Sequence, residues 1–161
     1  MDNAILFKTA RAGRGYFLQQ IQGINEDQLL LTPPEAGHNI LWNLGHIVYS
    51  NAALLYEPCA LNSPVPAHYE ALFKGGTSPS DWSETPNVRE CLELFASGPE
   101  TLIRDGQAGK FANYTPRQLA PGYVIENAEE AFLFNAFHEG IHLGMVMELR
   151  KFIGAGKHAA A

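Results

Sequence analysis

The segment from residue 127 to residue 153 constrains the fold of this chain more than any other part of the sequence. Its apolar residues would cover nearly every face of a helix, and a helix that is apolar all round is buried all round. We therefore expect it to pack against several other helices, with its last face covered by a long connection or by a second copy of the chain. These apolar residues are Phe132, Leu133, Phe134, Ala136, Phe137, Ile141, Leu143, Met145, Val146, Met147 and Leu149.

Three further segments show the apolar spacing and the end signals of helices, at about residues 3–22, 39–56 and 85–106. The Gly98-Pro99 pair predicts a kink or a break in the third of them. Residues 58–84 contain four prolines and a Gly-Gly pair and predict a long irregular connection. The alternation near residues 118–125 is too brief to predict a sheet. The chain is thus predicted to be a single all-α domain, residues 1–161, folded as a four-helix bundle whose second and third helices are joined by the long connection, with a flexible tail from about residue 154.

The charge pattern excludes some partners. The net charge is -6 and the eleven basic residues are scattered, which argues against binding to nucleic acid. No apolar run is long enough to span a membrane and nothing resembles a signal peptide, so we expect a cytoplasmic protein. Charged residues make up only 17% of the chain, which indicates an oligomer interface. Cys59 and Cys91 form no C-x-x-C pair and are expected to be ordinary thiols.

Residues 138–142 read His-Glu-Gly-Ile-His and place two histidines on one face of a helix, one turn apart. This H-E-x-x-H spacing is also the signature of zinc proteases, in which the glutamate, here Glu139, is the general base. The protease interpretation is disfavoured because only nineteen residues follow His142, and Met145 and Glu148 stand where one protease class needs Gly and His. His158, the last histidine, lies in the predicted tail.

A better third ligand lies upstream. His46 is midway along the second predicted helix and could face His138 and His142 across the bundle. Three neutral imidazoles with an open coordination position suit Zn²⁺, Ni²⁺ or Fe²⁺. The alternative is a set of hydrogen-bonded core histidines. Asn43 and Asn135, each about a turn before a histidine, could hydrogen-bond a ligand or serve only in packing. His38 and His68 are expected near solvent.

The stretch Trp42-x-x-x-His46, followed after a long gap by His138-x-x-x-His142-x-Gly144, resembles the DinB superfamily over roughly residues 4–153. The resemblance implies a bundle in up-up-down-down order, a metal held by His46, His138 and His142, and a homodimer. Characterised relatives include S-transferases and isomerases that depend on low-molecular-weight thiols. This chain departs from the family in carrying Met145 where glutamine is frequent, which predicts a change in the polarity of the pocket.

Together these features predict a metal-dependent enzyme that acts on a small molecule, either as a thiol-dependent S-transferase or as a hydrolase. Glu139 is the candidate catalytic residue, as a general base or by orienting a ligand, although a solvent-facing or salt-bridged role is an equal alternative. The other class of function is a non-catalytic metal-binding or stress-related module. An open coordination position facing a pocket would favour the enzyme, and a fourth protein ligand would favour the structural role.

Overall fold

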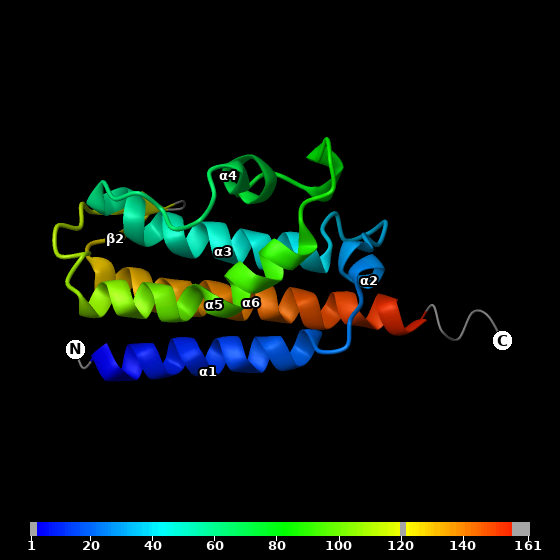
Figure 1. Cartoon of the computed structure of the whole chain (residues 1–161), viewed down its shortest axis with the longest axis horizontal. Helices are drawn as coiled ribbons and strands as arrows, with labels where there is room; N and C mark the ends of the chain where they lie inside the picture. Colours follow the sequence, from blue (N-terminus) through cyan, green and yellow to red (C-terminus); the bar gives the residue numbers. More distant parts are fainter. Residues whose placement is uncertain (1–2, 120–121, 156–161) are drawn as a thin grey trace.

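The computed structural model describes residues 3–119 and 122–155 and confirms the all-α bundle (Figure 1). The ends of the four long helices lie within three residues of the predicted ends, and shorter elements occupy the connections. The helices are α1 (Asn3–Ile21), α2 (Glu26–Leu30), α3 (Ile40–Tyr56), α4 (His68–Phe73), α5 (Val88–Gln107) and α6 (Ala128–Ala155), with 3₁₀ turns η1 (Glu57–Cys59) and η2 (Pro79–Asp81) and strands β1 (Arg117–Leu119) and β2 (Tyr123–Ile125).

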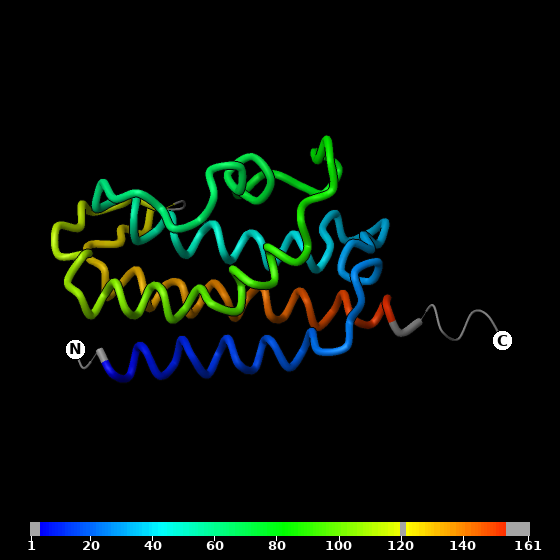
Figure 2. Tube along the Cα trace, in the orientation of Figure 1, coloured from blue at the N-terminus to red at the C-terminus, as the bar shows by residue number. Residues whose placement is uncertain are grey.

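The four long helices form a ring in which α3 and α1 each contact both α5 and α6. The helix α6 is antiparallel to α3, since Asn43 bonds His142 while Asn51, further along α3, bonds Asn135. The helix α5 is parallel to α3, because it pairs with α3 in the same order, from Cys91 beside Leu41 to Asp105 beside Tyr56. The trace in Figure 2 shows the same directions. The order is therefore up-down-down-up, and the predicted up-up-down-down order is wrong.

The lengths of the connections explain this order. Residues 22–39, which include α2, turn back at one end of the bundle, so α3 returns antiparallel to α1. Residues 57–87 instead run back along the outside of α3, and α4 packs on α3 on the way (Figure 1). The α5 helix therefore begins at the same end as α3, as parallel neighbours require a long crossover.

Asparagine caps fix where two of the long helices begin. Oδ1 of Asn39 accepts from the backbone N–H of Trp42 at the start of α3, and Asn87 caps α5 in the same way through Glu90. Because the cap of α5 is Asn87, the helix begins at Val88 rather than near Thr85, and Pro86 precedes it.

Pro99 lies inside α5, which continues past it as one helix, so the predicted break does not occur. A proline has no N–H to give to the carbonyl four residues earlier, here that of Phe95. A guanidinium N–H of Arg14, Nη1, donates to that carbonyl instead. The side chain of Arg14 is only 4% exposed. A buried cation from α1 thus replaces the hydrogen bond that proline removes from α5.

The connection between α5 and α6 contains a small antiparallel hairpin, in which Arg117 pairs with Ile125 and Leu119 with Tyr123. The alternation near residues 118–125 therefore does form strands, although they are only three residues long. At the other end, α6 continues through Gly154 to Ala155. The rest of the predicted tail, with His158, lies outside the described residues.

One face of α6 is left exposed by residues 3–119 and 122–155. Phe137 is 64% exposed, and Leu133, Ile141 and Met145 on the same face are each more than two-fifths exposed. Of the two covers expected for this face, the long connection is not the one, because it packs on α3 instead. Cover by a second copy of the chain stays a prediction. No helix in the described part of the chain is both long and apolar enough to cross a membrane.

Candidate metal centre

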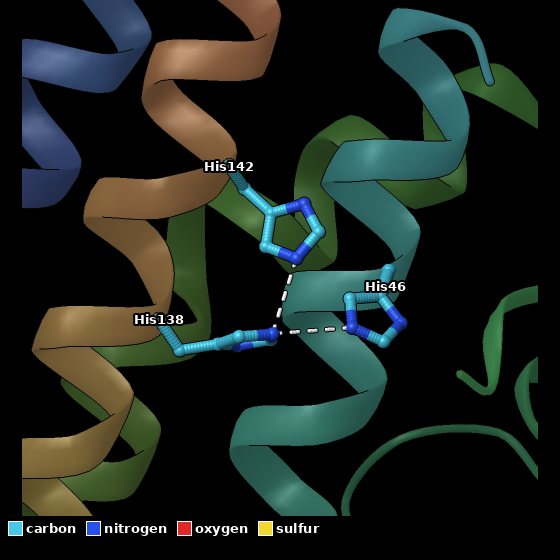
Figure 3. Close-up of side chains that lie close together, drawn as sticks. All are labelled: His46, His138 and His142. Carbon is cyan, nitrogen blue, oxygen red and sulfur yellow. Dashed lines mark hydrogen bonds between the residues drawn. The ribbon is translucent and has the colours of Figure 1, made fainter. Parts of the chain in front are cut away.

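Three histidines from two antiparallel helices meet between those helices (Figure 3). His46 comes from α3, and His138 and His142 come from α6. Nε2 of His138 lies 3.3 Å from Nε2 of His46 and 3.1 Å from Nε2 of His142. In a tetrahedral zinc site with Zn–N bonds of about 2.0–2.1 Å, ligand nitrogens are about 3.4 Å apart. Both distances are close to that spacing, and the three ligand atoms all lie within 4.8 Å of one another.

The ring of His46 is oriented by the backbone of the long connection. Its Nδ1 lies 2.7 Å from the carbonyl oxygen of Phe73 at the end of α4. A carbonyl only accepts, so Nδ1 carries the proton and Nε2 presents a lone pair. Phe73 can come this close because α3 has Gly45 beside it: a Cβ there would lie 2.4 Å from the Phe73 ring.

The ring of His142 is oriented by α3. Its Nδ1 lies 2.7 Å from Oδ1 of Asn43. The amide nitrogen of Asn43 donates to the carbonyl of Asn39 at 2.8 Å, so the amide oxygen must be the atom that faces the histidine. Nδ1 of His142 therefore carries the proton and Nε2 presents a lone pair, as in His46. Of the two roles considered for Asn43, the bond to a histidine is the one observed.

These hydrogen bonds leave more lone pairs than protons between the three rings, and a cation would bind all of those lone pairs. His46 and His142 both point lone pairs at Nε2 of His138, which can donate a proton to only one of them. Such an arrangement is unfavourable for three histidines packed for structure alone. A divalent cation accepts all three lone pairs together, so the donor set fits a metal. Fixing the tautomer through the other ring nitrogen is the usual way in which proteins prepare metal-binding histidines.

Burial keeps the three rings neutral. It lowers the pKa of His46, and together with the neighbouring imidazoles it lowers the pKa of His138 to about 4 and that of His142 to about 3. Near neutral pH all three are therefore unprotonated, which is the form that binds metal.

Glu139 points away from the three histidines toward α1 and α3. Its carboxylate binds Arg14 through two bonds, Nη2–Oε1 at 2.8 Å and Nε–Oε2 at 3.3 Å, and accepts from Nδ2 of Asn51 at 2.6 Å. The guanidinium of Arg14 also lies over the Phe95 ring, 3.8 Å from its centroid. Of the two roles considered for Glu139, the geometry matches the salt-bridged one.

The other polar candidates lie elsewhere. His38 is half-buried and packs against the far side of Trp42, which stacks on His46. His68 is exposed and lies beside Glu90. Nδ2 of Asn135 donates to the backbone of Asn51 at 3.2 Å.

A cleft of about 360 Å³ opens beside the centre, and His46 and His138 form part of its wall. Its other lining residues come from α3, the turn after α4, β1 and α6, including Tyr49, Lys74, Arg117 and Phe134. Met145 does not line the cleft and is 46% exposed on the outer face of α6. The predicted effect of Met145 on pocket polarity is therefore not supported. Sequence reasoning missed Lys74 and Arg117, because each lies in an irregular connection where nothing in the sequence indicates which helix it will face.

Comparison with sequence families fits this geometry. The profile of the DinB superfamily matches residues 9–146, which include all three histidines and most of the bundle. The chain belongs to the DinB superfamily. Comparison with curated protein sequences gives no match. Membership of the DinB superfamily thus rests on a match over most of the chain, and the histidine cluster of this member agrees with it.

Proposed function

We propose that this DinB protein is an enzyme that uses a divalent metal, held by His46, His138 and His142, to act on a small molecule. The observation that carries the proposal is that two of the three histidines form the wall of an open cleft. Among the described residues, these three are the only group of histidine, cysteine and acidic side chains placed so that they could hold a metal ion, and no fourth such side chain joins them. An open position is typical of catalytic rather than structural metal sites.

Three neutral imidazoles suit Zn²⁺, Ni²⁺ or Fe²⁺. When bound, such an ion supplies Lewis-acid chemistry and lowers the pKa of a thiol or water that binds beside it. The protein's own part is to hold the rings of His46 and His142 in one tautomer, through Phe73 and Asn43, and to place His46 and His138 in the wall of the cleft.

We favour a thiol-dependent S-transferase over a hydrolase because of the position of Glu139. A hydrolase of the H-E-x-x-H type needs that carboxylate as a general base, and here both carboxylate oxygens are bonded to Arg14. In the part of the chain that the structure describes, no aspartate or glutamate lines the cleft. A thiol has an ordinary pKa of about 8.5 and requires less help than water to become an anion. The apolar side chains of Leu54, Leu119 and Phe134 would shield the nucleophile from solvent.

The first test is elemental analysis of the purified full chain beside His46→Ala and His142→Ala. His68→Ala is the matched control, because His68 is exposed and binds only Glu90. We expect one equivalent of metal in the wild type and the control, and strong loss in the two site variants. Full occupancy in both site variants would overturn the three-histidine site.

The second test is transfer of a thiol to an electrophilic acceptor such as 1-chloro-2,4-dinitrobenzene, with glutathione, bacillithiol and mycothiol as donors. Turnover that depends on the metal and on His46 is expected with at least one donor. Metal-loaded protein that turns over none of them would favour the alternative, a non-catalytic metal-binding or stress-related module.

We also propose a homodimer in the cytoplasm. Both cysteines are free thiols, which suits a reducing compartment. The exposed face of α6 repeats Leu133, Phe137, Ile141 and Met145 at intervals of four residues. Gly140 and Gly144 on this helix have no atom within 4 Å of the position of a Cβ, so a second helix can approach closely there. A two-fold pairing of this face with itself would cover it.

A further inference from the structure

The described lining of the cleft beside the histidines contains basic side chains and no acidic ones. The charged side chains in its lining are Lys74, from the turn after α4, and Arg117, from β1. Among the described residues that line the cleft there is no acid, although the chain as a whole carries a net charge of -6. The carboxylates that pair with them, Glu70 and Glu57, do not line the cleft.

Both cations keep donors for a ligand. Arg117 uses Nη1 for its bonds to the Ala53 carbonyl at 3.2 Å and to Glu57 at 2.8 Å. The N–H groups of its Nη2 and Nε remain, and a guanidinium edge of that kind binds an oxyanion well. Lys74 gives one ammonium hydrogen to Glu70 at 2.8 Å and keeps the others.

A metal ion at the histidine centre would add positive charge beside these two cations. Its three ligands are neutral and contribute no compensating negative charge. A divalent ion held there would keep its full charge, facing the same cleft as Lys74 and Arg117. The remaining lining includes Ala53, Leu54, Leu119 and Phe134, which suits a short carbon skeleton between two polar ends.

We propose that the ligand of this cleft is a small organic anion whose oxyanion group lies between Lys74 and Arg117, while its other end reaches the histidine centre. This inference rests on the proposed function, whose substrate class it narrows. Lys74 and Arg117 are then specificity-determining residues. They bind the substrate and take no part in holding the metal.

The test is a binding titration of the full chain loaded with Co²⁺, which reports a bound thiolate by its absorption. The probes are 3-mercaptopropionate and its neutral amide, 3-mercaptopropionamide, which differ only in the charged end. We expect the carboxylate to bind at least about tenfold more tightly, a difference of about 1.4 kcal/mol. Competition by succinate and by inorganic phosphate then shows whether the site prefers a carboxylate or a phosphate, and displacement by either supports the inference.

The variants are Lys74→Gln, Arg117→Gln and the double substitution. The double variant should bind both probes equally and keep its full content of Co²⁺. The matched control is Arg89→Gln, which removes an exposed cation paired with Glu93 and should preserve the preference. Equal binding of the two probes by Co²⁺-loaded wild type would overturn the inference.

If the chain binds no Co²⁺, the proposed function is overturned, but the anion site can still be tested separately. Calorimetric titration of the metal-free chain with succinate still tests the anion site, because Lys74 and Arg117 do not depend on the metal. Binding that is lost in the double variant would support the site. The absence of binding in the metal-free and the Co²⁺-loaded wild type would overturn it.

Discussion

Nδ1 of His142 donates a hydrogen bond of 2.7 Å to Oδ1 of Asn43, and this bond joins α6 to α3 at the histidine centre. Since Asn43 is itself held by the carbonyl of Asn39, the ring of His142 has one orientation and one tautomer. The caps and turns of α3 are thereby connected to the geometry of the site.

The Asn43→Ala substitution should lower metal affinity, because His142 loses the acceptor that keeps Nε2 free for the ion. Loss of such a supporting partner typically costs about 10–100-fold in affinity. Competition with a chromophoric chelator measures it. Asn43→Asp keeps an acceptor for His142 and should recover much of the affinity. Equal affinities for wild type and Asn43→Ala would show that the bond does not orient the ligand.

The Arg14→Met substitution should destabilise the fold strongly. It leaves the carbonyl of Phe95 without that donor and the carboxylate of Glu139 without its cation, although Glu139 keeps its bond from Asn51. Breaking a buried ion pair by removing one side costs about 3–5 kcal/mol in the free energy of unfolding. Urea denaturation measures this loss. The control is Arg11→Met, whose exposed pair with Glu100 should matter far less.

Pro99→Ala should recover part of the stability lost in Arg14→Met. Alanine restores an N–H at residue 99, which can donate to the Phe95 carbonyl as in an ordinary helix. The two substitutions should therefore be non-additive in a double-mutant cycle. Additivity within about 0.5 kcal/mol would mean that Arg14 does not replace the missing hydrogen bond.

The Gly45→Ala substitution should lower both stability and metal affinity. The added Cβ would lie 2.4 Å from the Phe73 ring, so α4 must move away and take with it the carbonyl that orients His46. Overpacking of this kind costs about 1–3 kcal/mol. The control is Gly15→Ala on α1, where the new methyl meets no atom within 4 Å. This variant of the protein should be slightly more stable than the wild type, because alanine favours a helix. Unchanged metal affinity in Gly45→Ala would show that the position of α4 does not affect how His46 binds the metal.

The metal-free protein should lose stability as the pH falls. The pKa values of His138 and His142 are lowered by burial from 6.5 to about 4 and about 3, so the unfolded chain takes up protons before the folded chain does. Their contribution is complete above about pH 6.5 and is lost progressively between about pH 6.5 and pH 4–3. Urea unfolding in the presence of EDTA measures it, and a His138→Gln/His142→Gln variant should show a flatter profile. If the stability of the variant fell with pH as steeply as that of the wild type, His138 and His142 would not be the source of the pH dependence.

The Phe137→Glu substitution should convert a dimer into a monomer, because it places a charge on the exposed face of α6, where Phe137 is 64% exposed. Light scattering with size-exclusion chromatography measures the mass. Metal content should not change, since Phe137 is not a ligand. The control is Arg89→Glu on α5, away from this face. A wild type that is monomeric at all concentrations would refute the proposed dimer.

The sequence by itself determined the number and the approximate limits of the long helices, and it identified His46, His138 and His142 as residues that meet. The helix limits depend on local periodicity and capping residues, and the pairing of His138 with His142 depends on spacing along one helix, all of which act over a few residues. His46 was added by its position midway along a predicted helix and by the resemblance to the DinB superfamily. The spacing of His138 and His142 fixes their common face wherever the helix lies.

The tertiary structure alone decided the direction of the helices, the tautomers of the histidines and the position of Glu139. Each depends on a partner distant in the sequence: the path of residues 57–87, the carbonyl of Phe73, and Arg14 on α1. The same holds for Lys74 and Arg117, which two separate connections bring to one cleft. Contacts of this kind form only when the bundle packs, so no local pattern of residues predicts them.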